Sequence, residues 1–367
     1  MGEMTYDCGW SIQQRLVMAN GVPRLISTLN REINPSSWLL SCQLDLTTGS
    51  GAGNQLEKPA EPIIFDPRSS REHCEWYTIC LLRLYELSFL LTVPLLFLRQ
   101  AKGAPNVALH PHCIFQRGTS PIIAAAVHNG HDTRRSVEKR LAIGEDEQER
   151  EEDPITGEWT QIAKTQIVGL RSRFEVDLNR PRDKAVYETP ADAWGMDVWD
   201  TPPDPQMIEA SLREYDEFYQ DVEALLREMI EEHGRVVVYD LHTYNHRREG
   251  ADAPPADPRK NPEVNVGTGT MDRNLWAPVV DRFIGELRAY DFHGRHLDVR
   301  ENVKFQGGYF GEWIHTTFPE QACAIAIEFK KFFMDEWEGE ADPDEVDCIY
   351  KALESTLPGV QTALRQL

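Results

Sequence analysis

The sequence predicts an α/β sandwich built on a mixed, largely parallel sheet. Short apolar runs rich in β-branched residues have the length of buried strands, and amphipathic stretches with a helical period separate them. Strands that alternate with helices along a chain form a sheet with helices packed on its faces. Ligands of such sheets bind beyond the carboxyl ends of the strands. Polar residues that follow the predicted strands are therefore the first candidates for function.

Four stretches carry the strand signal. Residues 121–127, 236–239 and 323–327 are continuous apolar runs, as expected of strands buried on both faces. Residues 171–178 alternate apolar and charged side chains, which predicts a strand with one buried face. Each stretch runs into polar side chains, so we expect four strand ends to meet at one edge of the sheet.

Helices are predicted between these strands. Residues 207–233 repeat apolar side chains with a 3.6-residue period, and residues 275–290 do the same over a shorter length. The charged stretch 133–152 predicts a solvated helix and loop. Residues 194–205 form a loop with two tryptophans, which either cover a pocket as a lid or pack the loop against the domain.

The first part of the chain carries no functional signal. We predict an N-terminal segment, residues 1–105, packed on a main domain of residues 106–367. Residues 72–98 are rich in leucine and aromatics and predict helix, whereas the loop-forming residues 49–54 lack the context of a dinucleotide fingerprint. The most apolar stretch, 87–98, is too short to span a bilayer.

Composition restricts the partners. The 367-residue chain carries a net charge of −22, which repels phosphate backbones and argues against nucleic acid, but a locally basic pocket still admits a small anionic substrate. Seven scattered cysteines and the lack of a signal peptide predict reduced thiols in the cytoplasm, with no membrane partner. The tract 110–113, with two histidines and a cysteine, fits a loop before a strand better than a metal site.

The strand ends supply a set of metal ligands and a base. His128 and His131 follow the first strand, with Asp132 beside them, and His242 follows the strand 236–239. Zinc in hydrolases takes three nitrogen or carboxylate ligands and leaves one position open to water, which becomes a nucleophile near neutral pH. Glu328, after the strand 323–327, fits the role of proton shuttle. We expect one Zn²⁺ per chain, with His131 or Asp132 as the third ligand.

Each motif alone allows a simpler interpretation. An HxxH turn is more often free of metal than not, and a lone His242 fits a hydrogen-bonded structural histidine. Glu328 lies on the same face as Lys330 by the two-residue period, so these two fit a salt bridge at the strand end. Their shared place at the ends of buried strands favours the functional interpretation.

Four strings carry a resemblance to a known family. In order after HNGH they are RSRFEVDLNR, VVVYDLH, NVKFQGGYF and AIAIEFKKFFMDEW, and together they resemble the N-formylglutamate amidohydrolase family, which is related to zinc carboxypeptidases and aspartoacylase. The resemblance covers residues 115–335. It implies a three-layer α/β/α sandwich with a mixed central sheet, a single zinc and hydrolysis of an N-acyl amino acid, typically N-formyl-L-glutamate to formate and glutamate.

The resemblance also implies roles for individual residues. His128 and His242 match metal ligands, and Glu328 matches the general base. Arg173 matches an arginine that polarises the scissile carbonyl, a role suited to a fixed cation. The remaining matches or neighbours that we expect at the substrate are Asn179 and Arg180 on a carboxylate, the pair Gly307 and Gly308, and Tyr244, His246, Arg247 and Lys330.

The sequence departs from the pattern at two points. Zinc carboxypeptidases have HxxE at the first two ligands, whereas the fourth position here is His131. The residues after DLH are unusually basic, and His246, Arg247 and Arg248 either bind a second carboxylate or phosphate or form a solvated turn. Three functions therefore stay open: an amidohydrolase for N-acylated acidic amino acids, a carboxypeptidase-type peptidase, and a non-catalytic dicarboxylate-binding protein.

Overall fold

The computed structural model describes residues 2–6, 10–19, 22–31 and 106–367. The chain divides into two compact units, Met1–Thr92 and Val93–Leu367. In the first unit β1 (Gly2–Tyr6), β2 (Trp10–Ala19) and β3 (Val22–Arg31) form an antiparallel sheet. The predicted helix 72–98 and loop 49–54 lie outside the described residues, and the domain boundary at 105 and the packing of the N-terminal segment stay predictions.

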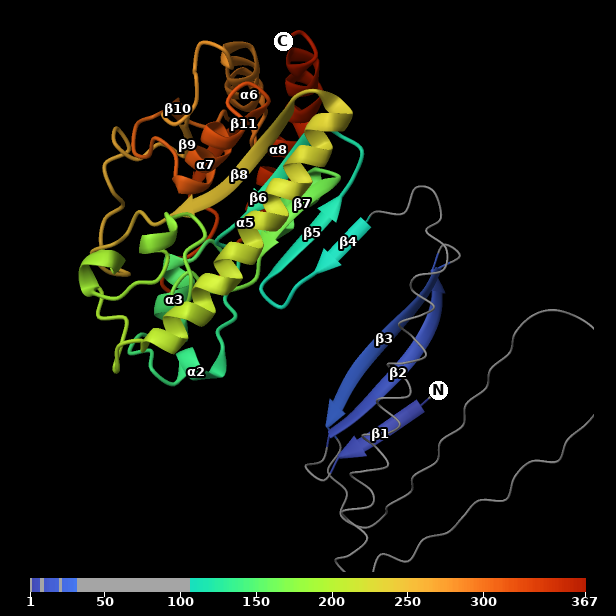
Figure 1. The fold of residues 1–367 in the computed structure, drawn as a ribbon, viewed down its shortest axis with the longest axis vertical. Helices are drawn as coiled ribbons and strands as arrows, with labels where there is room; N and C mark the ends of the chain where they lie inside the picture. Colours follow the sequence, from blue (N-terminus) through green and yellow to red (C-terminus); the bar gives the residue numbers. More distant parts are fainter. Residues whose placement is uncertain (1, 7–9, 20–21, 32–105) are drawn as a thin grey trace, which may run out of the picture. The chain divides into compact units, whose positions relative to one another are not determined.

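The second unit is built on an eight-stranded mixed sheet in the order β10-β9-β11-β8-β6-β7-β5-β4. Parallel pairs join β6 to β7 and β8, β8 to β11, and β9 to β10, whereas the remaining pairs are antiparallel. The strands are β4 (Asn106–Leu109), β5 (Cys113–Arg117), β6 (Ile122–Ala126), β7 (Thr165–Gly169), β8 (Val236–Tyr244), β9 (Val264–Gly267), β10 (Val299–Glu301) and β11 (Ala322–Lys330). Figure 1 shows β6, β8 and β11 in the middle of this sheet.

Helices cover both faces of the sheet. The long ones are α5 (Pro205–His233), α6 (Ala277–Ala289), α7 (Tyr309–Thr317) and α8 (Pro343–Leu364). The short ones are α2 (Arg135–Glu138), α3 (Glu145–Glu151), α4 (Thr156–Trp159), η1 (Thr160–Ile162), η2 (Arg182–Lys184) and η3 (Pro190–Ala193). In the part of the chain that the structure describes, no helix is both long enough and apolar enough to cross a membrane.

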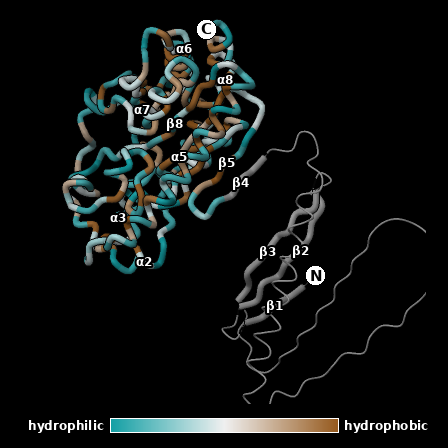
Figure 2. The backbone as a smooth tube through the Cα atoms, viewed as in Figure 1, coloured by the Kyte–Doolittle hydropathy of each residue, from teal (hydrophilic) through white to brown (hydrophobic). Residues whose placement is uncertain are grey.

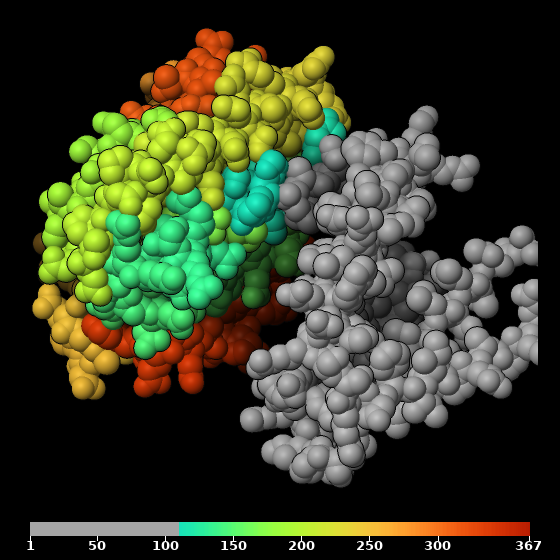
Figure 3. Space-filling model, turned by 60° about the horizontal axis from the view of Figure 1, so that its bottom comes forward, coloured from blue at the N-terminus to red at the C-terminus, as the bar shows by residue number. Residues whose placement is uncertain are grey.

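Two apolar cores separate the three layers. Alternate strand residues point to opposite faces, so Val237 and Tyr239 of β8 pack with α6 and α8, whereas Val236 and Val238 pack with α5 and α7. The structure thus confirms the predicted three-layer α/β/α sandwich with a mixed sheet. Figure 3 shows α5, in yellow-green to yellow, across one outer face of this unit.

The sequence explains the length and position of α5. Asp204 caps its first turn by accepting hydrogen bonds from the backbone N–H groups of Gln206 and Met207, both at 3.0 Å, and Pro205 fits the first helical position. Gly234, with φ of 77°, ends the helix where a side chain would be strained. Hydrophobic and hydrophilic residues alternate along α5 (Figure 2), as expected of a helix with one buried face.

The prediction of a strand at residues 171–178 is wrong. The strand is β7, which ends at Gly169, and the residues after it form tight turns in which Glu175 and Val176 both donate backbone hydrogen bonds to Ser172. The alternation misled because its charged side chains are buried as well: Asp177 is fully buried, and it bonds other side chains instead of solvent. Buried polar residues in the segment 171–178 indicate that a functional site lies nearby.

Candidate metal centre and substrate pocket

Strand β8 carries His242 into the site. All nine residues of β8 are buried, and the strand continues past the predicted end at Tyr239 to Tyr244. Because strand side chains two residues apart share a face, Asp240 and His242 point the same way. Nε2 of His242 lies 2.9 Å from Oδ1 of Asp240. The histidine thus lies within a rigid strand and not on a loop beyond it.

His128 reaches the same place from the neighbouring strand. β6 pairs in parallel with β8, with Ala125 opposite Asp240, so the carboxyl ends of the two strands are adjacent. His128 follows the end of β6, and its ring centroid lies 5.2 Å from that of His242. Parallel pairing therefore brings together two histidines that are far apart in the sequence.

Asp153 completes the group. Its backbone N–H donates to the carbonyl oxygen of His128 at 3.0 Å, which fixes the segment between α3 and α4 at the strand ends. Oδ2 of Asp153 lies 2.9 Å from Nδ1 of His242 and 3.4 Å from Nδ1 of His128, and Oδ1 accepts a hydrogen bond from Thr243 at 2.9 Å. Donor atoms of the two histidines and Asp153 all lie within 4.8 Å of one another.

The outer nitrogens of both imidazoles are held by carboxylates. Nε2 of His128 lies 2.6 Å from Oδ1 of Asp177, matching the bond between His242 and Asp240. An ionised carboxylate only accepts, so each Nε2 carries a proton. Each Nδ1 can then offer its lone pair to a cation beside Asp153, once that cation has displaced the Nδ1 proton. Metal-bound histidines in proteins are oriented in this way. Two nitrogens and one carboxylate oxygen are a donor set that fits zinc.

The charges of the group also fit a cation. Burial raises the pKa of the Asp153 carboxyl, but bonds from His128 and His242 outweigh burial and hold that pKa well below its usual range. Burial lowers the pKa of His242, yet the carboxylates of Asp240 and Asp153 raise it well above its usual range. Carboxylates thus dominate this buried cluster, and a divalent cation would neutralise part of their charge.

The structure does not bring His131 or Asp132 into this group. Nδ1 of His131 lies 2.6 Å from Oε2 of Glu152, and its side chain is 46% exposed. The bond to Glu152 raises the pKa of His131. Asp132 is exposed, and its backbone pairs with Leu170 and Ser172. Asp153 therefore takes the place at the two histidines that the sequence suggested for one of these residues.

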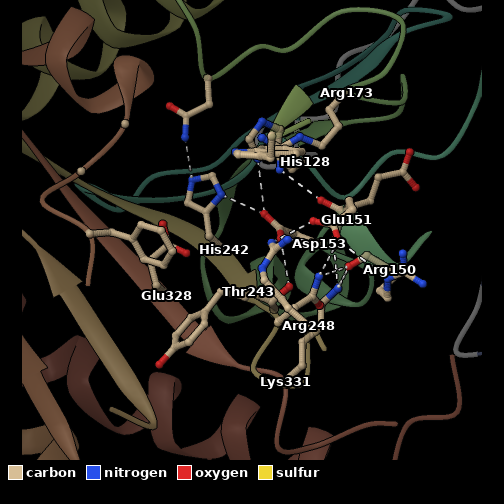
Figure 4. Close-up of a pocket in the computed structure, with 18 residues that line it drawn as sticks. His128, Arg150, Glu151, Asp153, Arg173, His242, Thr243, Arg248, Glu328 and Lys331 are labelled. Carbon is tan, nitrogen blue, oxygen red and sulfur yellow. Dashed lines mark hydrogen bonds and ion pairs between the residues drawn. The ribbon is translucent and has the colours of Figure 1, made fainter. Parts of the chain in front are cut away.

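Glu328 lies beside the group on the next strand. β11 pairs in parallel with β8, and Glu328 stands opposite His242 in the register. Burial raises the pKa of Glu328 to about 7, with further upward shifts from Asp153 and Asp240 and downward shifts from His242 and His128. A carboxyl group with a pKa near neutral suits both acceptance and donation of a proton. In Figure 4 His242 lies between Glu328 and Asp153.

These residues line a cavity of about 210 Å³. Asn179 lines it, and its side-chain oxygen accepts the backbone N–H of Phe310 at 2.8 Å. Arg173 also lines it and is fixed by a bond of 3.0 Å to Oδ2 of Asp177. Arg180 does not line the cavity, since its guanidinium stacks 4.7 Å from the ring of Tyr187. The structure thus separates the expected carboxylate-binding pair.

The two glycines predicted near the substrate are both found at the cavity. Gly307 and Gly308 both line the cavity, and Gly307 has φ of 118°, which favours glycine. A Cβ atom on Gly308 would overlap the side chain of Asn179. The close approach therefore requires glycine at 308. Tyr244 lines the cavity as well, with its hydroxyl bonded to the carbonyl of Pro262.

The other predicted substrate contacts lie outside the cavity. Nδ1 of His246 lies 3.1 Å from Oε2 of Glu336, and Arg247 donates its backbone N–H to the same carboxylate. Lys330 bonds weakly to the carbonyl of Asn261, with no ion pair to Glu328 among the described residues. Arg248, the third residue of the predicted basic turn, does line the cavity, and so does Lys331 next to Lys330.

Sequence reasoning missed several lining residues. They share no motif, and three of them belong to the acidic stretch 133–152 that predicted solvated helix. The unexpected residues are Arg150, Glu151, Glu152, Asp153, Thr243, Asn245, Phe305 and Lys331. Glu151 and Glu152 are buried, which corrects the prediction for the end of that stretch. In the loop 194–205, Trp194 is 49% exposed and lines the cavity, whereas Trp199 donates to the carbonyl of Tyr187 and packs the loop down. One tryptophan of the loop therefore lies at the cavity, and the other packs the loop against the domain.

Comparisons with known proteins place this site in a family. The N-formylglutamate amidohydrolase family matches residues 120–334, more than half of the chain. The chain therefore belongs to the N-formylglutamate amidohydrolase family, and its class is that of the amidohydrolases. A search of curated proteins finds no significant match.

Three solved structures are similar to this chain at low sequence identity. An N-formylglutamate amidohydrolase from Ralstonia eutropha JMP134 is similar over 72% of this chain and 100% of its own, with 15% identity and a TM-score of 0.54. A protein from Agrobacterium tumefaciens matches over 67% of this chain and 92% of its own, at 16% identity and a TM-score of 0.48. A carboxypeptidase A-like protein from Shewanella denitrificans OS-217 matches over 68% of this chain and 60% of its own. The sequence identity is 13% and the TM-score is 0.30.

Proposed function

We propose that the protein is a zinc-dependent hydrolase that cleaves the amide of an N-acylated acidic amino acid, such as N-formyl-L-glutamate, to formate and glutamate. The observation that carries the proposal is the buried group of His128, Asp153 and His242 with Glu328 beside it at one cavity. Family membership supports the amide bond as the target. The cavity volume of about 210 Å³ suits a small substrate.

Nδ1 of His128, Nδ1 of His242 and Oδ2 of Asp153 would hold the ion. A zinc ion held there supplies a Lewis acid and lowers the pKa of water toward neutrality. Asp177 and Asp240 keep the two imidazoles in the tautomer that leaves Nδ1 free. The chain thus provides three ligands, their orientation and a cavity lined mostly by polar and charged residues.

Glu328 is the proposed general base and acid. Its carboxylate accepts a proton from the water that attacks the carbonyl carbon, and then donates that proton to the leaving nitrogen. Arg173, fixed by Asp177, is placed to stabilise negative charge on the carbonyl oxygen, and Asn179 to bind a polar group of the substrate. We also propose that the protein is cytoplasmic, as expected from its reduced cysteines.

The first test is metal content followed by activity. Purified protein should contain one zinc ion per chain by mass spectrometry and should release formate from N-formyl-L-glutamate faster than from N-acetyl or apolar N-formyl amino acids. A chelator should abolish that release, and added zinc should restore it. Protein that binds no divalent metal, or hydrolyses short peptides better than every N-acyl amino acid, contradicts the proposal.

Glu328→Gln provides the second test. Loss of the base should lower kcat by about 10²- to 10⁴-fold, because general base catalysis contributes factors of this size. Metal content should stay at one per chain, since Glu328 is outside the donor group. Unchanged formate release in this variant would remove Glu328 from the mechanism.

A further inference from the structure

Lys331 is a buried cation at the cavity. Its residue is 1% exposed, yet it lines the cavity beside Asp153. Nζ donates hydrogen bonds to the carbonyl oxygens of Arg150 at 2.7 Å and Glu152 at 2.9 Å. An ammonium group has three N–H donors. Two of them are used by the backbone, so one donor remains for another partner.

The other cations of the cavity differ from Lys331 because each has a carboxylate partner. The nearest pairs are Arg173 with Asp177 at 3.0 Å, Arg248 with Glu151 at 2.9 Å and Arg150 with Glu151 at 3.7 Å. Among the described residues no carboxylate oxygen lies within 4 Å of Nζ of Lys331. Burial lowers the pKa of Lys331 to about 8 against the upward pull of more distant carboxylates, so the group is largely charged at neutral pH.

A buried charge without a counterion is costly, and buried charges in proteins are normally paired. A substrate carboxylate would complete such a pair at Lys331. We propose that Lys331 is an anion subsite that binds a carboxylate on the side chain of the substrate. The inference rests on the proposed function and deepens it: selection for an acidic amino acid is assigned to Lys331. Of the basic turn that the sequence suggested for this role, His246 and Arg247 face Glu336. Arg248 lines the cavity, but it is paired with Glu151 at 2.9 Å.

The position of Lys331 agrees with a substrate that has charges at two ends. In Figure 4 Arg173 and Lys331 lie on opposite sides of Asp153. Arg173 is tied through Asp177 to His128, whereas Lys331 is tied to the segment before Asp153. A small molecule bound across the donor group would therefore meet one cation on each side.

Lys331 also has a structural role, and the experiment must distinguish that role from binding of the substrate anion. Its bonds to the carbonyls of Arg150 and Glu152 hold the segment that carries Asp153. Loss of those bonds would shift Asp153 and weaken metal binding for every substrate alike. Loss of an anion subsite would affect only substrates that carry the side-chain charge.

Lys331→Met keeps the unbranched side chain to within one atom of its length and removes its charge. Lys330→Met is the matched control because Lys330 does not line the cavity. We compare kcat/KM for N-formyl-L-glutamate and for N-formyl-L-glutamine, which has the same shape without the charge. Lys331→Met should lower the ratio of the two values by about 10- to 100-fold, the size expected for a lost charge-assisted hydrogen bond. Lys330→Met should leave the ratio unchanged.

Equal losses on both substrates in Lys331→Met, together with lower metal content, would overturn the subsite and leave only the structural role. The proposed function can fail separately, since the wild-type protein would then hydrolyse neither substrate. In that case calorimetry with the zinc-loaded protein measures binding of glutarate against its monoamide. A preference for glutarate that Lys331→Met abolishes supports the subsite, and a preference that survives overturns it.

Discussion

Two histidines buried in the same domain have opposite surroundings. His315 on α7 is 7% exposed, with Nδ1 3.0 Å from the hydroxyl of Thr270 and Nε2 accepting the backbone N–H of Ala324 at 2.9 Å. Burial lowers its pKa to about 4, so it is a neutral part of the core. His242 is equally buried, but Asp153 and Asp240 lie at its two nitrogens and raise its pKa.

The difference shows that a buried histidine requires hydrogen-bond partners but does not require charged ones. His315 needs only a hydroxyl and a backbone N–H, and both partners are neutral. The carboxylates at His128 and His242 exceed that requirement and would cost free energy if they had no further use. A cation between Nδ1 of both rings and Asp153 would give them that use. The comparison therefore favours a metal centre over an ordinary buried hydrogen-bond network.

Substitution of Asp153 should have the largest effect on the environment that distinguishes His242 from His315. Asp153→Ala removes the carboxylate between the two imidazoles, and we expect loss of bound zinc and of formate release together. His131→Ala is the matched control, because His131 bonds Glu152 outside the group. That variant should keep one zinc per chain and its activity within about twofold, as substitutions away from the site do.

Mass spectrometry of the metal and a formate assay measure both variants, and thermal unfolding checks that they fold. A His131→Ala protein without zinc, next to an Asp153→Ala protein that retains it, would restore His131 as the third ligand and reject the group described above.

A smaller effect is expected from the carboxylates behind the rings. Asp240→Asn removes the charge that holds Nε2 of His242, and outer partners of metal-bound histidines contribute about 10- to 100-fold to affinity or activity. Zinc affinity, measured by competition with a chelator, should fall by this factor. Asp216→Asn is the control, because Asp216 pairs with Arg182 on the surface. Equal zinc affinities in the two variants would show that Asp240 does not support the site.

Substitution of His315 should have the smallest effect on activity but a clear effect on the pH dependence of the free energy of unfolding. Its pKa is about 4 in the folded protein against 6.5 unfolded, so the unfolded chain binds a proton first as the pH falls. The stability it contributes is complete above pH 6.5 and is lost as the pH falls toward 4. From pH 7.5 to 4.5 the loss is about 2–3 kcal/mol.

Urea unfolding of wild type and His315→Gln at both pH values measures this contribution. Since all other groups are shared, the wild type should lose about 2–3 kcal/mol more than the variant on acidification. Parallel pH dependence in the two proteins would show that His315 is protonated in the core, and the contrast with His242 would lose its basis.

Much of the fold was predictable because its signals are local. The apolar runs at 121–127, 236–239 and 323–327 became β6, β8 and β11, and the helical period at 207–233 became α5. These signals need only chain periodicity. The strand expected at 171–178 failed because periodicity reports burial on one face, and there both sets of side chains are buried against different partners.

Within the site, the residues that follow a predicted apolar run and match the ligand pattern were found, whereas Asp153 on a loop and Lys331 directly after β11 were not. His128, His242 and Glu328 follow or continue apolar runs, so the sequence marks them. Asp153 and Lys331 have no such mark: one is among many acidic residues, and the other is next to a second lysine. Their assignment as ligand and anion subsite remains a prediction.

The sequence by itself determined the strands, the long helices and the two histidines whose positions follow from strand ends, since local patterns of burial specify these. Only the tertiary structure decided that Asp153 rather than His131 lies between the imidazoles, and that Lys331 rather than Lys330 reaches the cavity. The reason is that a strand pattern states which face a side chain takes, whereas the meeting of a loop with a strand depends on distances across the folded chain.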